Sequence, residues 1–248
     1  MLSERSRLSR WQSVAETLSL LVVAAAVAWL AVARAAPPSP PAGAGVAARR
    51  PAPPVPTEPI SLAGTELLGK RTARVGLVIY SDFQCPFCAR FATDTLPGLQ
   101  RKYVKTGKVR LAFRQFPLPI HAQAQKAAEA AVCAGRQGQF WPYHDLLFAN
   151  PQALDETSLL GRASSLGLDQ PAFATCLRGE VAAAVRADYA GGAPLGVTGT
   201  PTFLAGPIVD GDRLRVTHRF SGALPIAQFE AVLDQVLGAA AKAAPGTR

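Results

Sequence analysis

The sequence predicts an α/β fold, and three observations indicate it. Residues 74–81 form a β-branched, apolar run typical of a buried strand, residues 88–104 have helical spacing, and residues 108–116 alternate as a second strand. A Cys-x-x-Cys pair stands between the first strand and the helix. Because open α/β sheets place their sites at the carboxyl ends of strands, this β-α-β unit predicts a functional site at the two cysteines.

The remainder of the domain is expected in the order helical insertion, strand, strand, helix. Helices are expected at 121–135, 139–150, 155–167, 169–179 and 180–193, and Asp155 is expected to be the N-cap of the third. A hairpin is expected from strands at 200–206 and 213–220, joined by a turn at 210–212, and a last amphipathic helix at 225–240. Pro97 is expected to kink the helix that follows the cysteine pair.

The N-terminal segment, residues 1–35, is predicted to be a membrane anchor or a signal peptide. Three arginines precede an apolar run at 18–32, and the "ARA" at 33–35 resembles a signal cleavage site. Residues 36–59 are rich in Pro and Ala and predict an extended linker, which suits a stalk and therefore favours the anchor. Positive charge before the run places the rest of the chain outside the cytoplasm, in the cell envelope.

The folded part is expected to be one domain at residues 60–240. Its helical insert is expected at about 119–193, and residues 241–248 are expected to be a flexible tail.

The charge of the chain is basic, with 26 Lys and Arg against 17 Asp and Glu and a net charge of +9. The longest basic cluster is "LQRKYVKTGKVR" at 99–110. It could be a patch for an acidic partner or a membrane surface, but a solvated face is the plainer interpretation. Since no segment resembles a nucleic-acid-binding motif, no nucleic-acid partner is expected.

The cysteine pair, Cys85 and Cys88, could be half of a zinc site, a structural staple or a redox centre. At the start of a helix, the helix dipole and free backbone N–H groups lower the pKa of Cys85 and favour its thiolate. Cys85 is therefore expected to be the accessible nucleophile and Cys88, one turn later, the shielded resolving thiol. Pro86 suits the first helical turn, and Phe87 has no side-chain donor for a thiolate.

The zinc interpretation lacks ligands, because a structural zinc site needs four. Cys133 and Cys176 are far apart in sequence, and the three histidines, His121, His144 and His218, form no ligand pattern. Neither a metal nor an organic cofactor is expected. The segment "VTGTPTF" at 197–203 supports a redox site instead, since a cis proline at Pro201 would expose the backbone of Thr200 to the sulfur and to a substrate peptide, although an edge-strand proline is the ordinary alternative.

Residues 60 to about 240 resemble the DsbA-like thiol–disulfide oxidoreductases of the thioredoxin superfamily. The matching segments are "SDFQCPFCARF", "RQFPLPIHAQAQKAAEAAVCA", "GQFWPYHDLLF", "LGLDQPAFATCL" and "GVTGTPTF". The resemblance implies a thioredoxin fold with an inserted helical subdomain, with Cys85 as nucleophile, Cys88 as resolving thiol and Pro201 as the cis proline. It also implies a structural disulfide between Cys133 and Cys176, for which two independent buried thiols are the alternative.

The sequence departs from the family pattern at two positions. Ile79 stands where many relatives carry a buried acid that assists proton transfer at the resolving cysteine, so either Glu66, Asp82 or a water substitutes for it, or the resolving step is slower. Phe87 stands where the strongest oxidants have histidine, which predicts a weaker oxidant. A reduction potential as high as about −120 mV would contradict that prediction. His121 is expected in a surface or capping role, with a place near the active-site groove as the alternative. Lys126 could approach the motif, and Trp141, Tyr143 and His144 are expected to pack or cap the insert.

The resulting hypothesis is an envelope oxidoreductase that donates its Cys85–Cys88 disulfide to reduced or unfolded exported proteins. A quinone-linked membrane partner is expected to reoxidise it. The alternatives are a reductase or isomerase kept reduced by a membrane donor, and a peptide-binding or chaperone module in which the two cysteines form a closed staple.

Overall fold

The computed structural model describes residues 54–243. The predicted anchor or signal peptide at 1–35, the linker up to residue 53 and the last five residues lie outside this range, so those predictions stay predictions. Within residues 54–243, no helix combines the length and apolar character that crossing a membrane requires.

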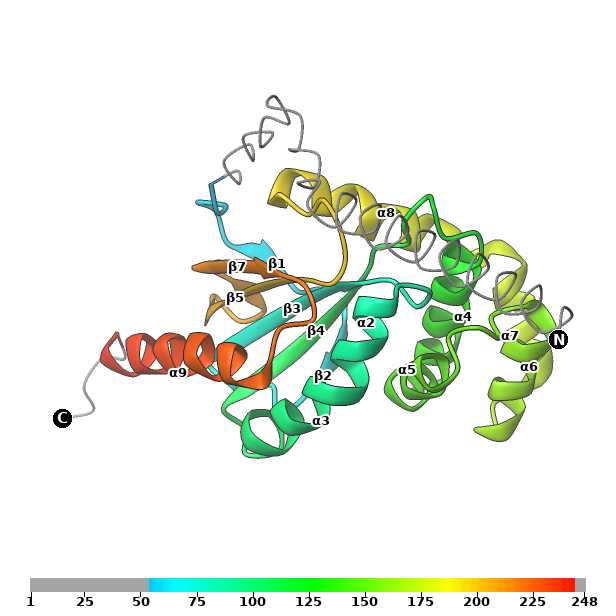
Figure 1. Ribbon diagram of the computed structural model, residues 1–248, viewed down its shortest axis with the longest axis horizontal. Coiled ribbons are helices and arrows are strands. Elements are labelled where there is room, and N and C mark those ends of the chain that lie inside the picture. The colour runs from blue at the N-terminus through cyan, green and yellow to red at the C-terminus, as the bar shows by residue number, and fades with distance from the viewer. Residues whose placement is uncertain (1–53, 244–248) are drawn as a thin grey trace, which may run out of the picture. The chain divides into compact units, whose positions relative to one another are not determined.

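A seven-stranded sheet forms the centre of the domain, in the order β1-β6-β5-β3-β4-β2, with β7 also paired to β5 (Figure 1). The central strand β3 pairs in parallel with β4, Val75 opposite Val109, and antiparallel with β5, Ile79 opposite Phe203. The bounds of the strands are β1 Ile60–Ser61, β2 Glu66–Leu68, β3 Val75–Ser81, β4 Val109–Gln115, β5 Thr202–Val209, β6 Arg213–Leu214 and β7 His218–Ser221. All seven residues of β3 are buried, as its continuous apolar pattern predicts.

Two features of the sheet differ from the prediction. β1 and β2 were not expected, because two or three residues are too few to show an alternating pattern. The strand expected at 213–220 is split into β6 and β7, which pair with opposite halves of β5. Between them the chain crosses Gly206 so closely that a Cβ atom there would lie 1.8 Å from the Arg215 carbonyl oxygen, so only glycine fits.

The segment after the cysteine pair is one helical run with two irregular turns. It comprises α2 (Pro86–Arg90), η1 (Phe91–Thr95), α3 (Leu96–Leu99) and η2 (Gln100–Val104), of which η1 and η2 have π-helical bonding. Pro97 lies in the first turn of α3, between the two π-helical turns, so the kink expected at Pro97 itself stays a prediction. This run and α9 (Ile226–Lys242) cover one face of the sheet (Figure 1). Between them Phe91, Phe203 and Phe229 pack with ring centroids 4.7–5.3 Å apart.

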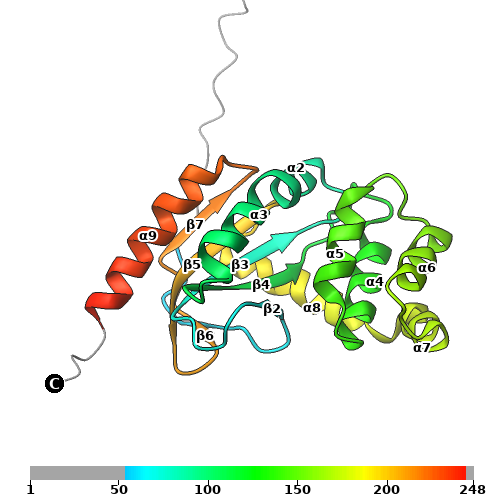
Figure 2. The same ribbon diagram turned by 90° about the horizontal axis from the view of Figure 1, so that it is seen from below.

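The helical insert follows β4 and lies beside the sheet, next to α2 (Figure 2). Its helices are α4 Ala124–Arg136, α5 Phe140–Ala149, α6 Glu156–Ser165, α7 Gln170–Thr175, η3 Cys176–Glu180, α8 Ala182–Gly192 and η4 Ala193–Leu195. The predicted cap is confirmed, because the Asp155 carboxylate accepts a hydrogen bond from the Ser158 backbone N–H at 3.0 Å.

The predicted disulfide between Cys133 and Cys176 is confirmed, with an S–S distance of 2.07 Å. It joins α4 to η3 within an apolar cluster of the insert that also includes Phe140, Tyr143 and Phe173. The bridge therefore holds together two helices that are 43 positions apart in sequence.

Candidate active site

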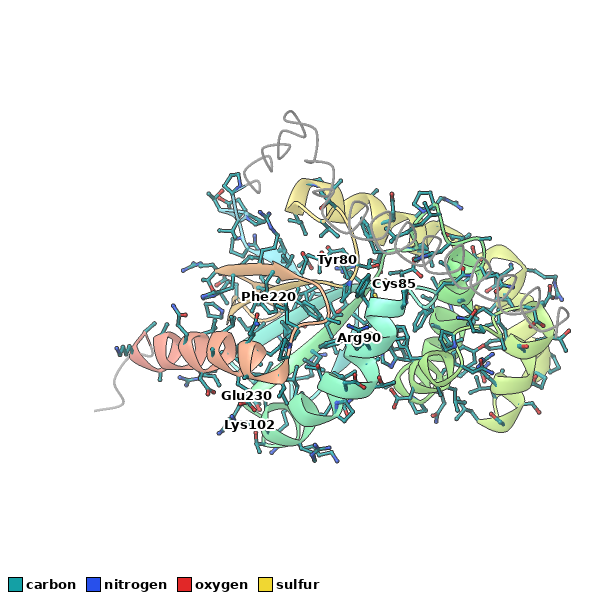
Figure 3. The ribbon with its side chains drawn as sticks, viewed as in Figure 1. Tyr80, Cys85, Arg90, Lys102, Phe220 and Glu230 are labelled. Atoms are coloured by element: carbon teal, nitrogen blue, oxygen red, sulfur yellow. A yellow bond between two sulfur atoms is a disulfide. The ribbon has the colours of Figure 1, made fainter. Side chains whose placement is uncertain are left out.

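The cysteine pair lies where the β-α-β pattern predicts it, at the carboxyl end of β3 (Figure 3). Cys85 is the N-cap of α2, with an extended backbone, and its N–H donates to the Asp82 carbonyl oxygen at 3.1 Å. Pro86 occupies the first turn of the helix, where its missing N–H leaves no hydrogen bond unmade. Both thiols are free of a disulfide, so the structure represents the reduced pair.

The loop before β5 lies against the first sulfur. When it is protonated, the Cys85 thiol donates to the Thr200 carbonyl oxygen at 3.4 Å, and the peptide bond between Thr200 and Pro201 is cis, as predicted. This contact follows from the sheet, because β5 pairs antiparallel with β3 and so begins where β3 ends. The Thr200 hydroxyl is buried and forms no hydrogen bond of full length among residues 54–243, but it lies close enough to the Cys85 sulfur to lower its pKa.

The two thiols have opposite pKa shifts. The pKa of Cys85 is lowered to about 5, mainly by the hydrogen bond from Cys88 and further by Thr200 and the backbone N–H groups of Cys88 and Phe87, against the opposing effect of burial. Burial raises the pKa of Cys88 well above its usual range, and the neighbouring Cys85 raises it further. Cys85 is therefore the thiolate at neutral pH and Cys88 the thiol that donates to it.

The exposure of the first cysteine differs from the prediction. Cys85 is only 3% exposed and Cys88 is fully buried, whereas Cys85 was expected to be accessible. The difference arises because the loop at Thr200 covers the sulfur from the side opposite the helix. The exposed member of the motif is Phe87, at 53%, with the Arg90 guanidinium 5.8 Å from its ring centre.

The position of the missing acid is filled by a buried apolar side chain, since Ile79 is 1% exposed in β3. The groups that lower the pKa of Cys88, against the larger effects that raise it, are the Ser81 hydroxyl and the Asp82 backbone. Glu66 and Asp82 were the two side chains considered as substitutes for the missing acid. Of these, Asp82 acts on the pKa of Cys88, and it does so through its main chain. Burial raises the pKa of Glu66, and the charge of Asp188 raises it further; Glu66 lies beside Gly135 of the insert.

The Asp82 carboxylate is fully buried and organises the turn before the cysteines. It accepts hydrogen bonds from the backbone N–H groups of Gln84 at 2.7 Å and Leu118 at 2.8 Å, and from His121 Nδ1 at 2.7 Å. Of the two places considered for His121, the structure shows the one near the active site, because its ring ties the segment after β4 to the active-site turn. No local pattern marks this contact, which joins residues 39 positions apart.

The other residues considered from the sequence have structural contacts. The Lys126 ammonium group donates to Glu129 and to the Leu177 carbonyl oxygen, so it is held within the insert rather than at the motif. The predicted packing role of Trp141, Tyr143 and His144 is confirmed. Trp141 donates to the Leu67 carbonyl oxygen, Tyr143 donates to that of Leu159, and His144 is buried against Phe83, Phe113 and Phe148.

The surface near the site has an apolar hollow of about 600 Å³ beside His121. Its lining includes Pro117, Leu118, Pro119 and Tyr189, and the adjoining Ile120 is 82% exposed. Among residues 54–243, no group of three or more His, Cys, Asp or Glu side chains is arranged to hold a metal ion. The free thiols of the described residues are Cys85 and Cys88.

The fold and the cysteine pair together define a thioredoxin-type domain. The family model described as thioredoxin matches residues 62–234, so the chain belongs to that family. The structure is similar to alpha-DsbA1 of Wolbachia pipientis, with a TM-score of 0.64 and 24% identity over 74% of this chain and 96% of that one.

Two curated relatives share part of the sequence. A probable disulfide bond formation protein D of Bacillus cereus is 34% identical over 84 residues, which is 34% of this chain and 39% of that protein. A Na⁺/H⁺ antiporter NhaA of Salinispora arenicola is 41% identical over 137 residues, which is 54% of this chain and 20% of the antiporter. The chain thus spans about a fifth of the antiporter's length. Most of the protein to which the antiporter's name applies lies outside the matched segment.

Proposed function

We propose that the protein is an extracytoplasmic thiol–disulfide oxidoreductase that donates the Cys85–Cys88 disulfide to reduced exported proteins. The observation that carries this proposal is the unequal pair of thiols at the start of α2, where the pKa of Cys85 is lowered to about 5 while that of Cys88 is raised. The similarity to a disulfide bond formation protein and the N-terminal sequence support the reaction and the location.

The reaction proceeds in two exchanges. A substrate thiolate attacks Cys85 of the oxidised pair, the S–S bond breaks, and Cys88 leaves and takes up a proton, as its raised pKa favours. A second substrate thiolate then attacks the substrate sulfur of the mixed disulfide, and Cys85 leaves as a thiolate. The substrate loses two electrons and gains a disulfide, and the protein retains the two electrons as its reduced pair.

The direction of exchange follows from the first thiol. A low pKa makes Cys85 a good leaving group and stabilises the reduced protein, so the disulfide form is driven to oxidise its substrate. A pKa of about 5 lies between the values of about 7 for thioredoxin and about 3.5 for DsbA, which predicts an oxidant of intermediate strength. A membrane partner that passes electrons to a quinone is expected to regenerate the disulfide.

The substrate is expected to be a flexible polypeptide rather than a folded one. Because Cys85 is only 3% exposed, a partner must bring its sulfur close to the Thr200 loop. The exposed Phe87 and the apolar hollow beside His121 offer contacts for apolar side chains of an unfolded segment. Because apolar contacts of this kind do not depend on one particular substrate sequence, they would accept many different substrates.

The test is the oxidative refolding of reduced, unfolded ribonuclease A by the oxidised protein. We expect one substrate disulfide to form for each protein disulfide consumed, and none with C85S. A reductase would instead cleave insulin disulfides with dithiothreitol but fail to oxidise ribonuclease. If C85S is as active as the unmodified chain, the site is not an exchange centre and the binding-module alternative is favoured.

A further inference from the structure

A basic surface lies at the end of the sheet away from the cysteines. Two turns form it, one before β3 and the other before β4. Since these strands are parallel, with Val75 opposite Val109, the two turns meet at the same end of the sheet. The Lys70 side chain reaches Gly107, where a Cβ atom would lie 2.8 Å from Lys70 Cδ. The members of this basic face, all exposed, are Lys70, Arg71, Arg74, Arg101, Lys102, Lys105 and Lys108.

Few carboxylates offset this charge. Arg71 pairs with Asp212, which also binds the buried Arg110, and Lys102 pairs with Glu230 at 3.1 Å. Within residues 54–243, no ion pair joins the remaining five cations of the basic face to a carboxylate. Two further carboxylates lie nearby: Asp210 beyond the end of β5, and Asp234, which accepts a hydrogen bond from Tyr103.

The charge of the helical insert is different, since acidic residues outnumber basic ones there. Its cations are largely held by local contacts, as in the Arg136–Glu180 pair and the Arg162 hydrogen bonds to backbone carbonyl oxygens. Among the residues that the structure describes, seven exposed cations therefore gather on the basic face while the insert carries more acidic than basic residues. Such a face attracts an anionic surface from a distance of about one Debye length.

The basic face and the active site lie at opposite ends of one helical run (Figure 3). Cys85 caps its start, and Arg101 and Lys102 lie in its last turn. A helix from 86 to 104 extends about 28 Å. Contact through the basic face therefore leaves Cys85 on the far side, free for a substrate.

The chemistry of the face fits a bilayer better than a nucleic acid. The aromatic ring within it, Tyr103, is 1% exposed and cannot stack on a base. In the sequence, an apolar run at 18–32 and a Pro-rich stretch at 36–59 precede the domain. A tether of that kind holds the domain near lipid headgroups but leaves its orientation open.

We propose that the basic face docks on an anionic phospholipid bilayer and turns Cys85 away from it. The electrostatic contact fixes the orientation of the domain on the bilayer, which the linker alone leaves open. The proposal concerns a surface separate from the cysteine pair, so it stands or falls independently of thiol exchange.

The test is lysine acetylation of the full chain in nanodiscs, read by mass spectrometry. With phosphatidylglycerol present, acetylation of Lys70, Lys105 and Lys108 should slow about threefold or more relative to pure phosphatidylcholine. Lys126, on the insert, should be unaffected, and raised salt should remove the difference. Equal rates in both lipids, or equal slowing at Lys126, would overturn the proposal.

Two matched variants sharpen this test. K105E/K108E should abolish the lipid-dependent protection of Lys70, whereas R178E/R186E, with the same charge change on the insert, should keep it. Loss of protection in both would indicate a dependence on net charge alone and would contradict a specific face. Protection by an added oligonucleotide in phosphatidylcholine discs, without an effect of phosphatidylglycerol, would replace the bilayer by a nucleic acid.

Discussion

The two cysteine pairs of this chain occupy different surroundings. Cys85 and Cys88 lie within one turn of α2, where Cys85 receives backbone N–H groups and faces the Thr200 carbonyl oxygen. Cys133 and Cys176 come from two helices and are bonded to each other within the apolar cluster of the insert. The first environment distinguishes the two sulfurs electrostatically. The second restrains the helices that carry them. The comparison indicates that position in the fold, rather than the residue type, decides which pair exchanges.

The strongest test of this difference between the two cysteine pairs is to remove one sulfur at a time. C85S should reduce thiol exchange more than about 100-fold, because no other thiolate is formed at neutral pH. C88S cannot form the protein disulfide, but its Cys85 thiolate should attack a disulfide-bonded substrate and release one substrate thiol. The resulting mixed disulfide should accumulate, visible as a mass shift on a non-reducing gel. A mixed disulfide at Cys133 or Cys176 would contradict the assignment.

The next test concerns the pKa of Cys85. Thiolate absorbance near 240 nm in the reduced protein should titrate with a midpoint of about 5, and C85S should lack that transition. Because the folded pKa is lower than the unfolded value near 9, the thiolate stabilises the reduced fold fully only above pH 9. That stabilisation should decline as the pH falls and disappear below about 5. A midpoint above 8 would remove the physical basis of the oxidase proposal.

The insert disulfide should affect stability rather than exchange. In C133A/C176A the free energy of unfolding in urea should fall by about 3 to 4 kcal/mol, since the bridge closes a loop of 43 positions. The exchange rate with reduced ribonuclease should stay within about twofold, because this bridge takes no part in the sulfur chemistry. A variant as stable as the unmodified chain, or a variant that is folded but inactive, would contradict the division of roles.

The smallest expected effect is that of T200V, which keeps the carbonyl oxygen beside Cys85 but removes the hydroxyl. Because Thr200 lowers the pKa of Cys85, Cys85 should titrate at a slightly higher pH in T200V. This rise should be smaller than the full difference between the folded pKa of Cys85 and its unfolded value, since Thr200 is one of several groups that lower it. The 240 nm titration measures this shift, with T72V, at an exposed threonine in the turn before β3, as the control. A lower midpoint in T200V would show that the hydroxyl has no such role.

The elements with a strong local pattern were predictable from the sequence. β3, the helical run after Cys85 and the Asp155 cap each depend on neighbouring residues, and all three occur as predicted. The cis peptide at Pro201 and the insert disulfide were expected from the resemblance to a family and are confirmed.

The features that depend on contacts between distant segments were not predictable. The Asp82–His121 hydrogen bond joins two loops, and no local pattern marks it. The burial of Cys85 results from the Thr200 loop, which approaches only once β5 has paired with β3. The short strands β1 and β2 likewise exist because partner strands offer hydrogen bonds, since their own sequences are too short to specify a strand.

The most direct test of the account is a titration of both disulfides in redox buffers of known potential, with thiols trapped by alkylation and each pair followed by peptide mass. We predict that Cys85–Cys88 is reduced between about −270 and −120 mV, the values for thioredoxin and DsbA, while Cys133–Cys176 stays oxidised to below about −300 mV. If the two pairs open together, or if Cys133–Cys176 opens first, the assignment of exchange to one pair and restraint to the other is wrong.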